Sequence, residues 1–170
     1  TRALAHACRQ AKETLLRDTS VASVPVVVPS RGSKLIGGAI RTEVTREELT
    51  QSLLEGFFPQ VAVSDAPLSR ARGGLTQLGL PYAQDAAITR HLGAFLSRQR
   101  DALAEVSGFE GTLPASASFL HPTAVLFNGG VLKSNLLAER VLNTLNGWLS
   151  AEGAAPARLL GGADLDLAVA

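Results

Sequence analysis

The sequence predicts an α/β protein with two subdomains, and three observations support this. The last third holds the same unit twice, a short apolar strand followed by two glycines and a helix, at 125–130 and 159–162. Strands that alternate with helices favour parallel pairing in an α/β layer. The first third instead holds two strand-like segments and short helices, which is typical of an antiparallel pair. We therefore expect a small α+β subdomain at 1–84 and an α/β subdomain at 85–170.

Composition excludes several classes of protein. The chain has 170 residues, 46% of them hydrophobic and 18% charged, with a net charge of +1. Such a balance gives no strong field toward nucleic acid or an anionic membrane, and the apolar runs are too short to span a bilayer. Cys8 is the single cysteine, so no disulfide framework is expected. We expect a cytoplasmic protein that binds neither nucleic acid nor membrane.

The chain contains no methionine, so we expect it to be a piece of a longer protein. Arginine outnumbers lysine and alanine is abundant, a bias common in bacteria with GC-rich genomes.

The first third is predicted to fold as a helix followed by two strands. A helix is expected over 2–17, because apolar residues recur there at helical spacing: Leu4, Cys8, Ala11 and Leu15. On that face Cys8 is expected to be buried as a small hydrophobe. The β-branched segment 21–29 predicts a strand, with Pro25 at its edge or start because proline lacks an N–H. A second strand is expected over 34–44, folded at Gly37–Gly38.

A capping box predicts the start of the next helix. Thr45 is followed three residues later by Glu48, and each side chain can satisfy a free backbone N–H at the helix start. We expect this helix to run to about Gly56. Residues 59–84 show no sustained period and carry scattered prolines and glycines, so we expect an irregular insertion on the surface.

Asp85 is expected to cap a third helix. The apolar face of that helix is predicted at six positions: Ile88, Leu92, Phe95, Leu96, Leu103 and Val106. A short buried strand follows at 122–127. After Gly129 and Gly130 a long helix begins, with its inward face at Leu132, Leu136, Val141, Leu142, Leu145 and Trp148.

The chain ends with a repeat of this unit. Gly153 to Pro156 should end the long helix, 157–162 should form a second strand, and Asp164 or Asp166 should begin another helix. In open α/β sheets, ligands bind beyond the carboxyl ends of the strands, where both glycine pairs lie. Glycine permits positive φ and close approach to the backbone, and helix N-termini attract anions. The glycine pairs therefore predict either a nucleotide or phosphate contact or only a tight β–α turn.

Three motifs together resemble a known family. "ACRQAKETLL" at 7–16, "FNGGVLKS" at 127–134 and "GADLDLAVA" at 162–170 look like the actin-like ATPase domain of DnaK-type, 70-kDa heat-shock chaperones. They occur in the family's order, and "LFNGGVLKS" is similar to a divergent bacterial branch. The resemblance implies lobe II of an actin-like, ribonuclease-H-like ATPase fold. Residues 1–84 would then be its outer subdomain and 85–170 an incomplete inner one.

The resemblance also implies an adenosine site. Lys12 matches a lysine that reaches the ribose, and Gly129 and Gly130 match the pair beneath the adenine. Lys133 stands where the family has an arginine over the base, and Asp166 matches the aspartate of the last motif.

The adenosine motifs also depart from the family pattern. Arg9 replaces a glutamate, Glu13 stands where a basic residue is common, and Leu16 and Val131 replace serines. Fewer hydrogen-bonding groups therefore remain for adenosine, and lysine cannot stack on the base as a planar guanidinium does.

The implied function is the adenosine side of the ATP or ADP cleft of a chaperone-like ATPase. The family's D-x-G-T phosphate loops and its groups around Mg²⁺ are absent from this sequence, so we expect no ATP hydrolysis by these residues alone. Nucleotide-exchange factors or co-chaperones are the expected partners, with unfolded proteins as clients of the parent. The alternatives are a non-catalytic interaction scaffold and a sugar-kinase-like relative of the same fold.

No other chemistry is indicated by the sequence. The three histidines, His6, His91 and His121, lack the spacing of a metal site. No serine stands in a G-x-S-x-G context, so a nucleophile elbow is not predicted.

Overall fold

The computed structural model describes residues 2–29, 38–68, 84–109 and 111–162. It shows a mixed α/β protein with one two-stranded antiparallel sheet and one two-stranded parallel sheet. The chain forms two compact units, Thr1–Leu53 and Leu54–Ala170. This boundary differs from the predicted division into 1–84 and 85–170, which stays a prediction.

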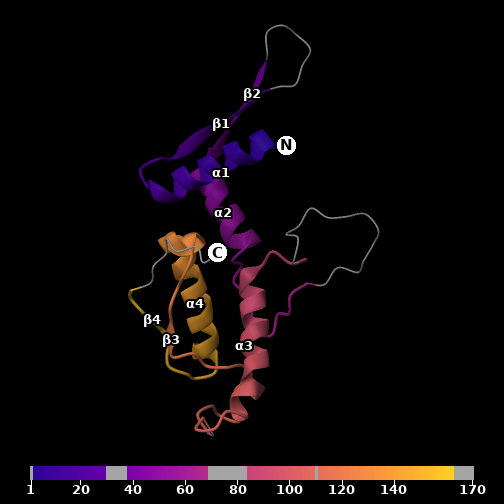
Figure 1. The fold of residues 1–170 in the computed structure, drawn as a ribbon, viewed down its shortest axis with the longest axis vertical. Helices are drawn as coiled ribbons and strands as arrows, with labels where there is room; N and C mark the ends of the chain where they lie inside the picture. The colour runs from indigo at the N-terminus through magenta and orange to yellow at the C-terminus, as the bar shows by residue number, and fades with distance from the viewer. Residues whose placement is uncertain (1, 30–37, 69–83, 110, 163–170) are drawn as a thin grey trace, which may run out of the picture. The chain divides into compact units, whose positions relative to one another are not determined.

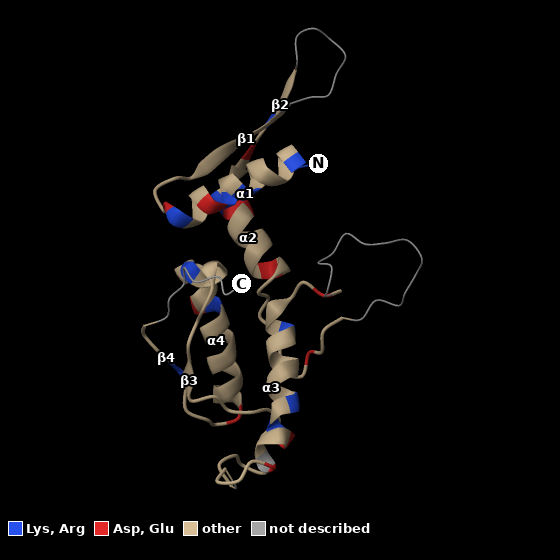
Figure 2. Ribbon diagram, viewed as in Figure 1, with Lys and Arg blue, Asp and Glu red and all other residues tan. Residues whose placement is uncertain are grey.

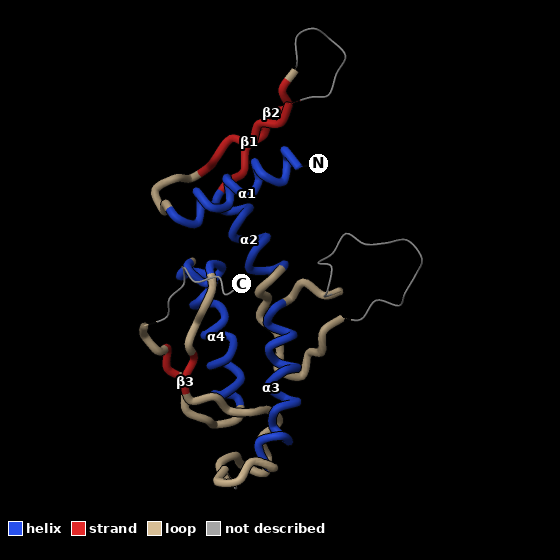
Figure 3. The backbone as a smooth tube through the Cα atoms, in the orientation of Figure 1, coloured by secondary structure: helices blue, strands red, loops and turns tan. Residues whose placement is uncertain are grey.

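The first unit is built on a helix packed against a strand. Its elements are α1 (Arg2–Arg17), β1 (Ser23–Pro29), β2 (Ala39–Thr45) and the start of α2 (Arg46–Gly56) (Figures 1 and 3). The predicted helix and both strands are confirmed for the described residues, whereas 34–37 lie outside them. Pro25 is the third residue of β1, in a sheet where both strands are edges.

The core of the first unit is small. Ala11 and Leu15 on α1 and Val26 on β1 are almost completely buried. Leu4 and Cys8 are exposed, so the prediction that they lie on a buried face is wrong. Helical spacing places them near Ala11 and Leu15, but only the second half of α1 is covered.

Arg46 ties the connection between α1 and β1 to the start of α2. Its guanidinium donates to the backbone carbonyls of Leu15, Asp18 and Val21, and its backbone N–H donates to the carbonyl of Ala22 over 2.8 Å. One planar cation thus hydrogen-bonds to three backbone carbonyls at a chain reversal.

The capping box before α2 is confirmed. The Thr45 N–H donates to Glu48 Oε2 over 3.0 Å, and the Glu48 N–H donates to Thr45 Oγ1 over 3.2 Å. The Thr45 N–H and the Thr45 hydroxyl both donate to the Glu48 carboxylate, and these two hydrogen bonds lower the pKa of Glu48 because they favour its ionised form.

The second unit has a larger core between two helices. It contains α3 (Ile88–Ala104), β3 (Ala124–Val125), the 3₁₀ turn η1 (Gly130–Lys133), α4 (Asn135–Ala151) and β4 (Arg158–Leu159). The buried cluster comprises Leu96, Phe119, Leu145, Trp148, Leu149 and Ala157. On α3, Leu92 and Leu96 face this core as predicted, whereas Ile88 and Phe95 are exposed. Val106 was predicted on the same face, but it is exposed and lies beyond the end of α3. On α4, Val141, Leu145 and Trp148 are buried as predicted, and Leu136 is not.

The segment before α3 is irregular where it is described, as predicted, but it is not only a surface insertion. Val61 and Val63 pack against the core cluster. The Trp148 indole N–H donates to the Val61 carbonyl over 2.7 Å. A Cβ added at Gly93 would lie 2.9 Å from the Val63 carbonyl oxygen, so only glycine fits there without a shift. Residues 69–83 lie outside the described residues.

The prediction that Asp85 caps α3 is wrong, because Asp85 lies two residues before the N-cap. The N-cap is Ala87, which has no side-chain cap, and Asp85 Oδ1 accepts the Ala87 N–H over 2.9 Å. Asp85 Oδ2 accepts the Leu68 N–H at 2.8 Å and Arg90 at 3.1 Å. Burial alone would raise the pKa of Asp85, but these hydrogen bonds outweigh it and lower that pKa.

The parallel sheet is a strand–helix–strand unit. β3 and β4 pair with Ala124 opposite Arg158 and Val125 opposite Leu159, which confirms the predicted parallel arrangement. Both strands are shorter than the predicted 122–127 and 157–162. The long helix does not start at the glycines, because η1 intervenes and α4 begins at Asn135. The predicted helix from Asp164 or Asp166 lies outside the described residues.

Gly153 ends α4 as expected. Its φ is +71°, and the N–H groups of Gly153 and Ala154 donate to the carbonyls of Ser150 and Leu149. This pattern is a Schellman motif, in which glycine tolerates the left-handed position. Among the residues that the structure describes, every helix falls short of the length and apolar character needed to cross a lipid bilayer.

Candidate functional site

The first candidate is the glycine turn between β3 and α4. Phe127 is buried just beyond β3, and the Asn128 side-chain oxygen accepts the Gly129 N–H over 2.8 Å. Gly129 has φ +85°, a conformation that other residues rarely adopt. The backbone conformation therefore explains the first glycine of the pair.

Gly130 has no such explanation. Its φ is not positive, and no described atom beyond its chain neighbours lies within 4 Å of an added Cβ. Gly130 is also exposed. Neither strain nor packing within the described residues requires glycine here, and the backbone of Gly130 is open on its exposed side.

The second glycine pair follows the neighbouring strand. The Leu160 N–H donates to the Val125 carbonyl over 2.8 Å, which aligns the two strand ends. Gly162 has φ +84°, whereas Gly161 lacks a positive φ and has open space around an added Cβ. Because parallel strands end at the same edge, both glycine pairs follow the carboxyl edge of this sheet, where α/β proteins bind ligands.

Lys133 closes the 3₁₀ turn that opens at Gly130. It is the last residue of η1, and its side chain is exposed. Ser134 is the N-cap of α4 but makes no side-chain cap bond. The structure therefore brings Gly129, Gly130 and Lys133 together in one exposed turn.

The predicted ribose contacts lie on the solvent face of α1. Lys12 is exposed, and Arg9 Nε donates to Glu13 Oε1 over 2.8 Å, one helical turn apart. Figure 2 shows basic and acidic residues side by side on this helix. The pairing raises the pKa of Arg9 and lowers that of Glu13, because each side chain hydrogen-bonds and attracts the other. Arg9, Lys12 and Glu13 thus share one helix surface.

These three residues belong to the first unit and the glycine turn belongs to the second, so the two halves of the predicted site are described separately. Asp166 lies outside the described residues. The adenosine site as a whole stays a prediction.

A cluster of polar side chains that the sequence did not indicate joins the end of α4 to the loop before β3. Glu152 accepts hydrogen bonds from the Ser118 hydroxyl and from the Ser118 N–H over 3.1 Å, and His121 Nε2 lies 2.7 Å from its Oε2. Ser118 and His121 both contact the carboxylate. A serine activated as a nucleophile would instead contact the histidine. We interpret the cluster as structural.

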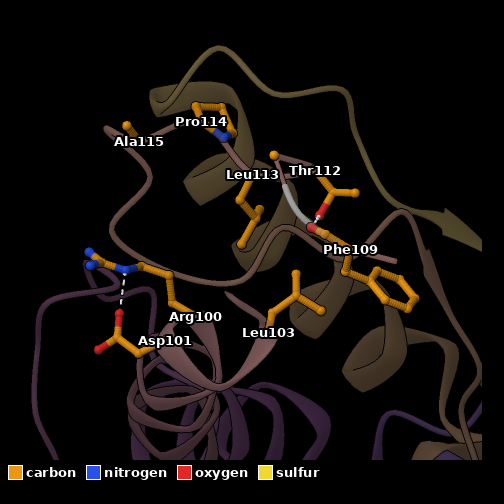
Figure 4. A pocket seen from close by; sticks show the side chains of 9 residues that line it. Arg100, Asp101, Leu103, Phe109, Thr112, Leu113, Pro114 and Ala115 are labelled. Atoms are coloured by element: carbon orange, nitrogen blue, oxygen red, sulfur yellow. Dashed lines mark hydrogen bonds and ion pairs between the residues drawn. The ribbon is translucent and has the colours of Figure 1, made fainter. Parts of the chain in front are cut away.

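Figure 4 shows a cavity of about 200 Å³ beyond the end of α3. Leu103, Phe109 and Leu113 line it, and at its rim Arg100 forms an ion pair with Asp101 over 2.8 Å. Ligand pockets usually enclose about 300–1,000 Å³, and none of the predicted site residues lines this one. In the described ranges no group of three His, Cys, Asp or Glu side chains could hold a metal ion.

Comparison of the chain with protein-family models, with curated proteins and with solved structures finds no match.

Proposed function

We propose that this chain supplies the adenosine side of the nucleotide cleft in an ATPase of the actin-like, ribonuclease-H-like fold, as part of a chaperone-like protein. The observation that carries the proposal is Gly130, a glycine that nothing in the described residues requires. A purine lying flat on the backbone there would exclude a side chain, which accounts for the residue.

The surrounding geometry supports the same interpretation. The turn follows a parallel strand at the edge where ligands bind in α/β sheets. Lys133 is three residues beyond Gly130, at the end of the same turn, and its side chain is exposed. The motif resemblance implies that Lys12 reaches the ribose, and this residue is exposed on α1 of the first unit. Nucleotide-exchange factors and co-chaperones would bind the first unit, and unfolded clients would be bound by the parent protein.

The second candidate is an interaction scaffold without nucleotide, and one observation favours it. Arg9 and Glu13 pair with each other on α1, at positions where the chaperone family uses side chains for adenosine. A pair engaged in this way leaves fewer hydrogen-bonding groups for a ligand.

Calorimetric titration of ATP and ADP into the protein separates the two candidates. Gly130→Val should weaken nucleotide binding by more than tenfold, about 1.4 kcal/mol, because its branched side chain would occupy the place of the base. Gly56→Val is the matched control, because Gly56 also has open space around an added Cβ. Unchanged affinity in Gly130→Val would remove the glycine turn from the site, and no binding by the unmodified protein would favour the scaffold.

A further inference from the structure

The second strand of the antiparallel sheet has a free edge. In the described part of the first unit, β2 pairs with β1 alone. Five consecutive residues of β2, 39–43, are exposed, and Ile40 is 65% exposed. An edge strand of this kind offers unpaired N–H and C=O groups to another strand.

The register shows which residues carry those groups. Pro25 lies opposite Glu43 and has no N–H, so this pair is not of the kind that exchanges two hydrogen bonds. The Thr45 N–H donates to Glu48, away from β1. Since backbone groups alternate along a strand, the odd-numbered residues of β2 direct their N–H and C=O outward. Arg41 and Glu43 therefore present the central unpaired backbone groups.

The sequence of β2 is complementary to itself in the antiparallel direction. With a two-fold axis at Thr42, Arg41 lies opposite Glu43 of a second strand, and Glu43 lies opposite Arg41. Both are outward-facing positions, so each pair can exchange two backbone hydrogen bonds as well as pair opposite charges. On the other face, Ile40 lies opposite Val44, which covers part of an exposed apolar side chain.

We propose that β2 is a self-association edge, at which two copies of this chain pair antiparallel about Thr42 to form a four-stranded sheet. The partner is a second copy, because one register pairs opposite charges, brings apolar side chains together and aligns the outward-directed N–H and C=O groups of both strands. A two-fold interface of this kind places the same patch on both subunits. The proposal is independent of the nucleotide site.

The pairing is expected to be weak. It involves one short strand from each copy and buries less than the roughly 1,200–2,000 Å² of a standard stable interface. We therefore expect a dimer that forms reversibly in the micromolar to millimolar range.

Sedimentation equilibrium of the 170-residue chain across that range tests the proposal. Arg41→Glu alone and Glu43→Arg alone each create two like-charge pairs in the dimer, and each should raise the dimer Kd about tenfold or more. An equimolar mixture of the two variants restores both opposite-charge pairs, so it should form a heterodimer near the original Kd. The double variant with Arg41→Glu and Glu43→Arg should also recover self-association.

Glu47→Arg is the control for Glu43→Arg. It makes the same change of charge at an exposed position on α2, beyond the strand. Its Kd should stay unchanged. The proposal would be overturned by any of three results. These are an unmodified chain that stays monomeric throughout the concentration range, single variants whose dimer Kd equals that of the unmodified chain, or a mixture of the two variants that does not recover dimerisation.

A crosslink tests the axis itself. Thr42 faces its own copy as a non-hydrogen-bonded pair, with Cα atoms about 4.5 Å apart, a separation that a disulfide can bridge. In a Cys8→Ser background, Thr42→Cys should oxidise to a disulfide dimer faster than Thr19→Cys, an exposed position off the strand. Equal rates would contradict an axis at residue 42.

Discussion

Two glycines inside long helices show how the surroundings of one residue decide its effect on stability. Gly93 in α3 lies against the Val63 carbonyl, where an added Cβ would be only 2.9 Å away and 3.5 Å from the Trp148 ring. Gly147 in α4 is exposed, and an added Cβ there would meet no described atom within 4 Å. The backbone conformation is helical at both positions, so packing is the main difference.

The same substitution should therefore have opposite effects at the two positions. Gly147→Ala should stabilise the second unit by about 0.5–1 kcal/mol, because alanine lowers the entropy of the unfolded chain without a clash. Gly93→Ala should destabilise it by about 1–3 kcal/mol, because the backbone of residue 63 must move. Urea unfolding followed by Trp148 fluorescence measures both free energies. If both substitutions changed the free energy of unfolding in the same direction, the close contact between Gly93 and the Val63 carbonyl would not be what requires glycine at position 93.

Element ends also depend on individual side chains, and Glu152 at the end of α4 is the clearest case. Its side chain is 21% exposed. Burial would raise the pKa of Glu152, but hydrogen bonds from the Ser118 hydroxyl, from His121 and from the Ser118 N–H outweigh that effect and lower it. The carboxylate thus holds the loop before β3 against the helix end, and the hydrogen bonds favour its ionised form.

The lowered pKa gives the sign of a pH dependence. A carboxyl whose pKa is lower in the folded state contributes stability above its unfolded value, and that contribution is lost as pH falls through the folded value. The advantage of the unmodified chain over Glu152→Gln should be full near pH 7 and should shrink below about pH 4.5, the ordinary range of glutamate. Urea unfolding of both proteins at pH 7 and pH 3 measures this difference. A constant difference would mean that the hydrogen bonds do not depend on the charge.

Elements whose signals are local were predictable from the sequence. The capping box before α2 and the glycine that ends α4 each act within a few residues, so the pattern alone was sufficient. Burial of Val61 was not predictable, because it depends on Trp148, 87 residues away. Exposure of Cys8 was missed for a similar reason, since its helix position is apolar but β1 does not cover that turn.

At the scale of the whole molecule, the sequence predicted the α/β class and the parallel order of β3 and β4, since strand–helix alternation dictates both. The candidate site was predictable only in part. Gly129 and Gly130 could be named because glycine pairs after strands are visible in the sequence. The roles of Lys12 and Asp166 depend on how distant segments meet, which local patterns do not encode.

The single tryptophan gives the two units different spectroscopic properties. Trp148 lies in the core of Leu54–Ala170, beside Phe119, whereas Thr1–Leu53 contains no Phe, Tyr or Trp. Indole emission therefore reports only on the unit that holds the glycine turn. The unit that holds the self-association edge is visible in backbone circular dichroism alone, so comparing the two signals during unfolding assigns each transition without an added label.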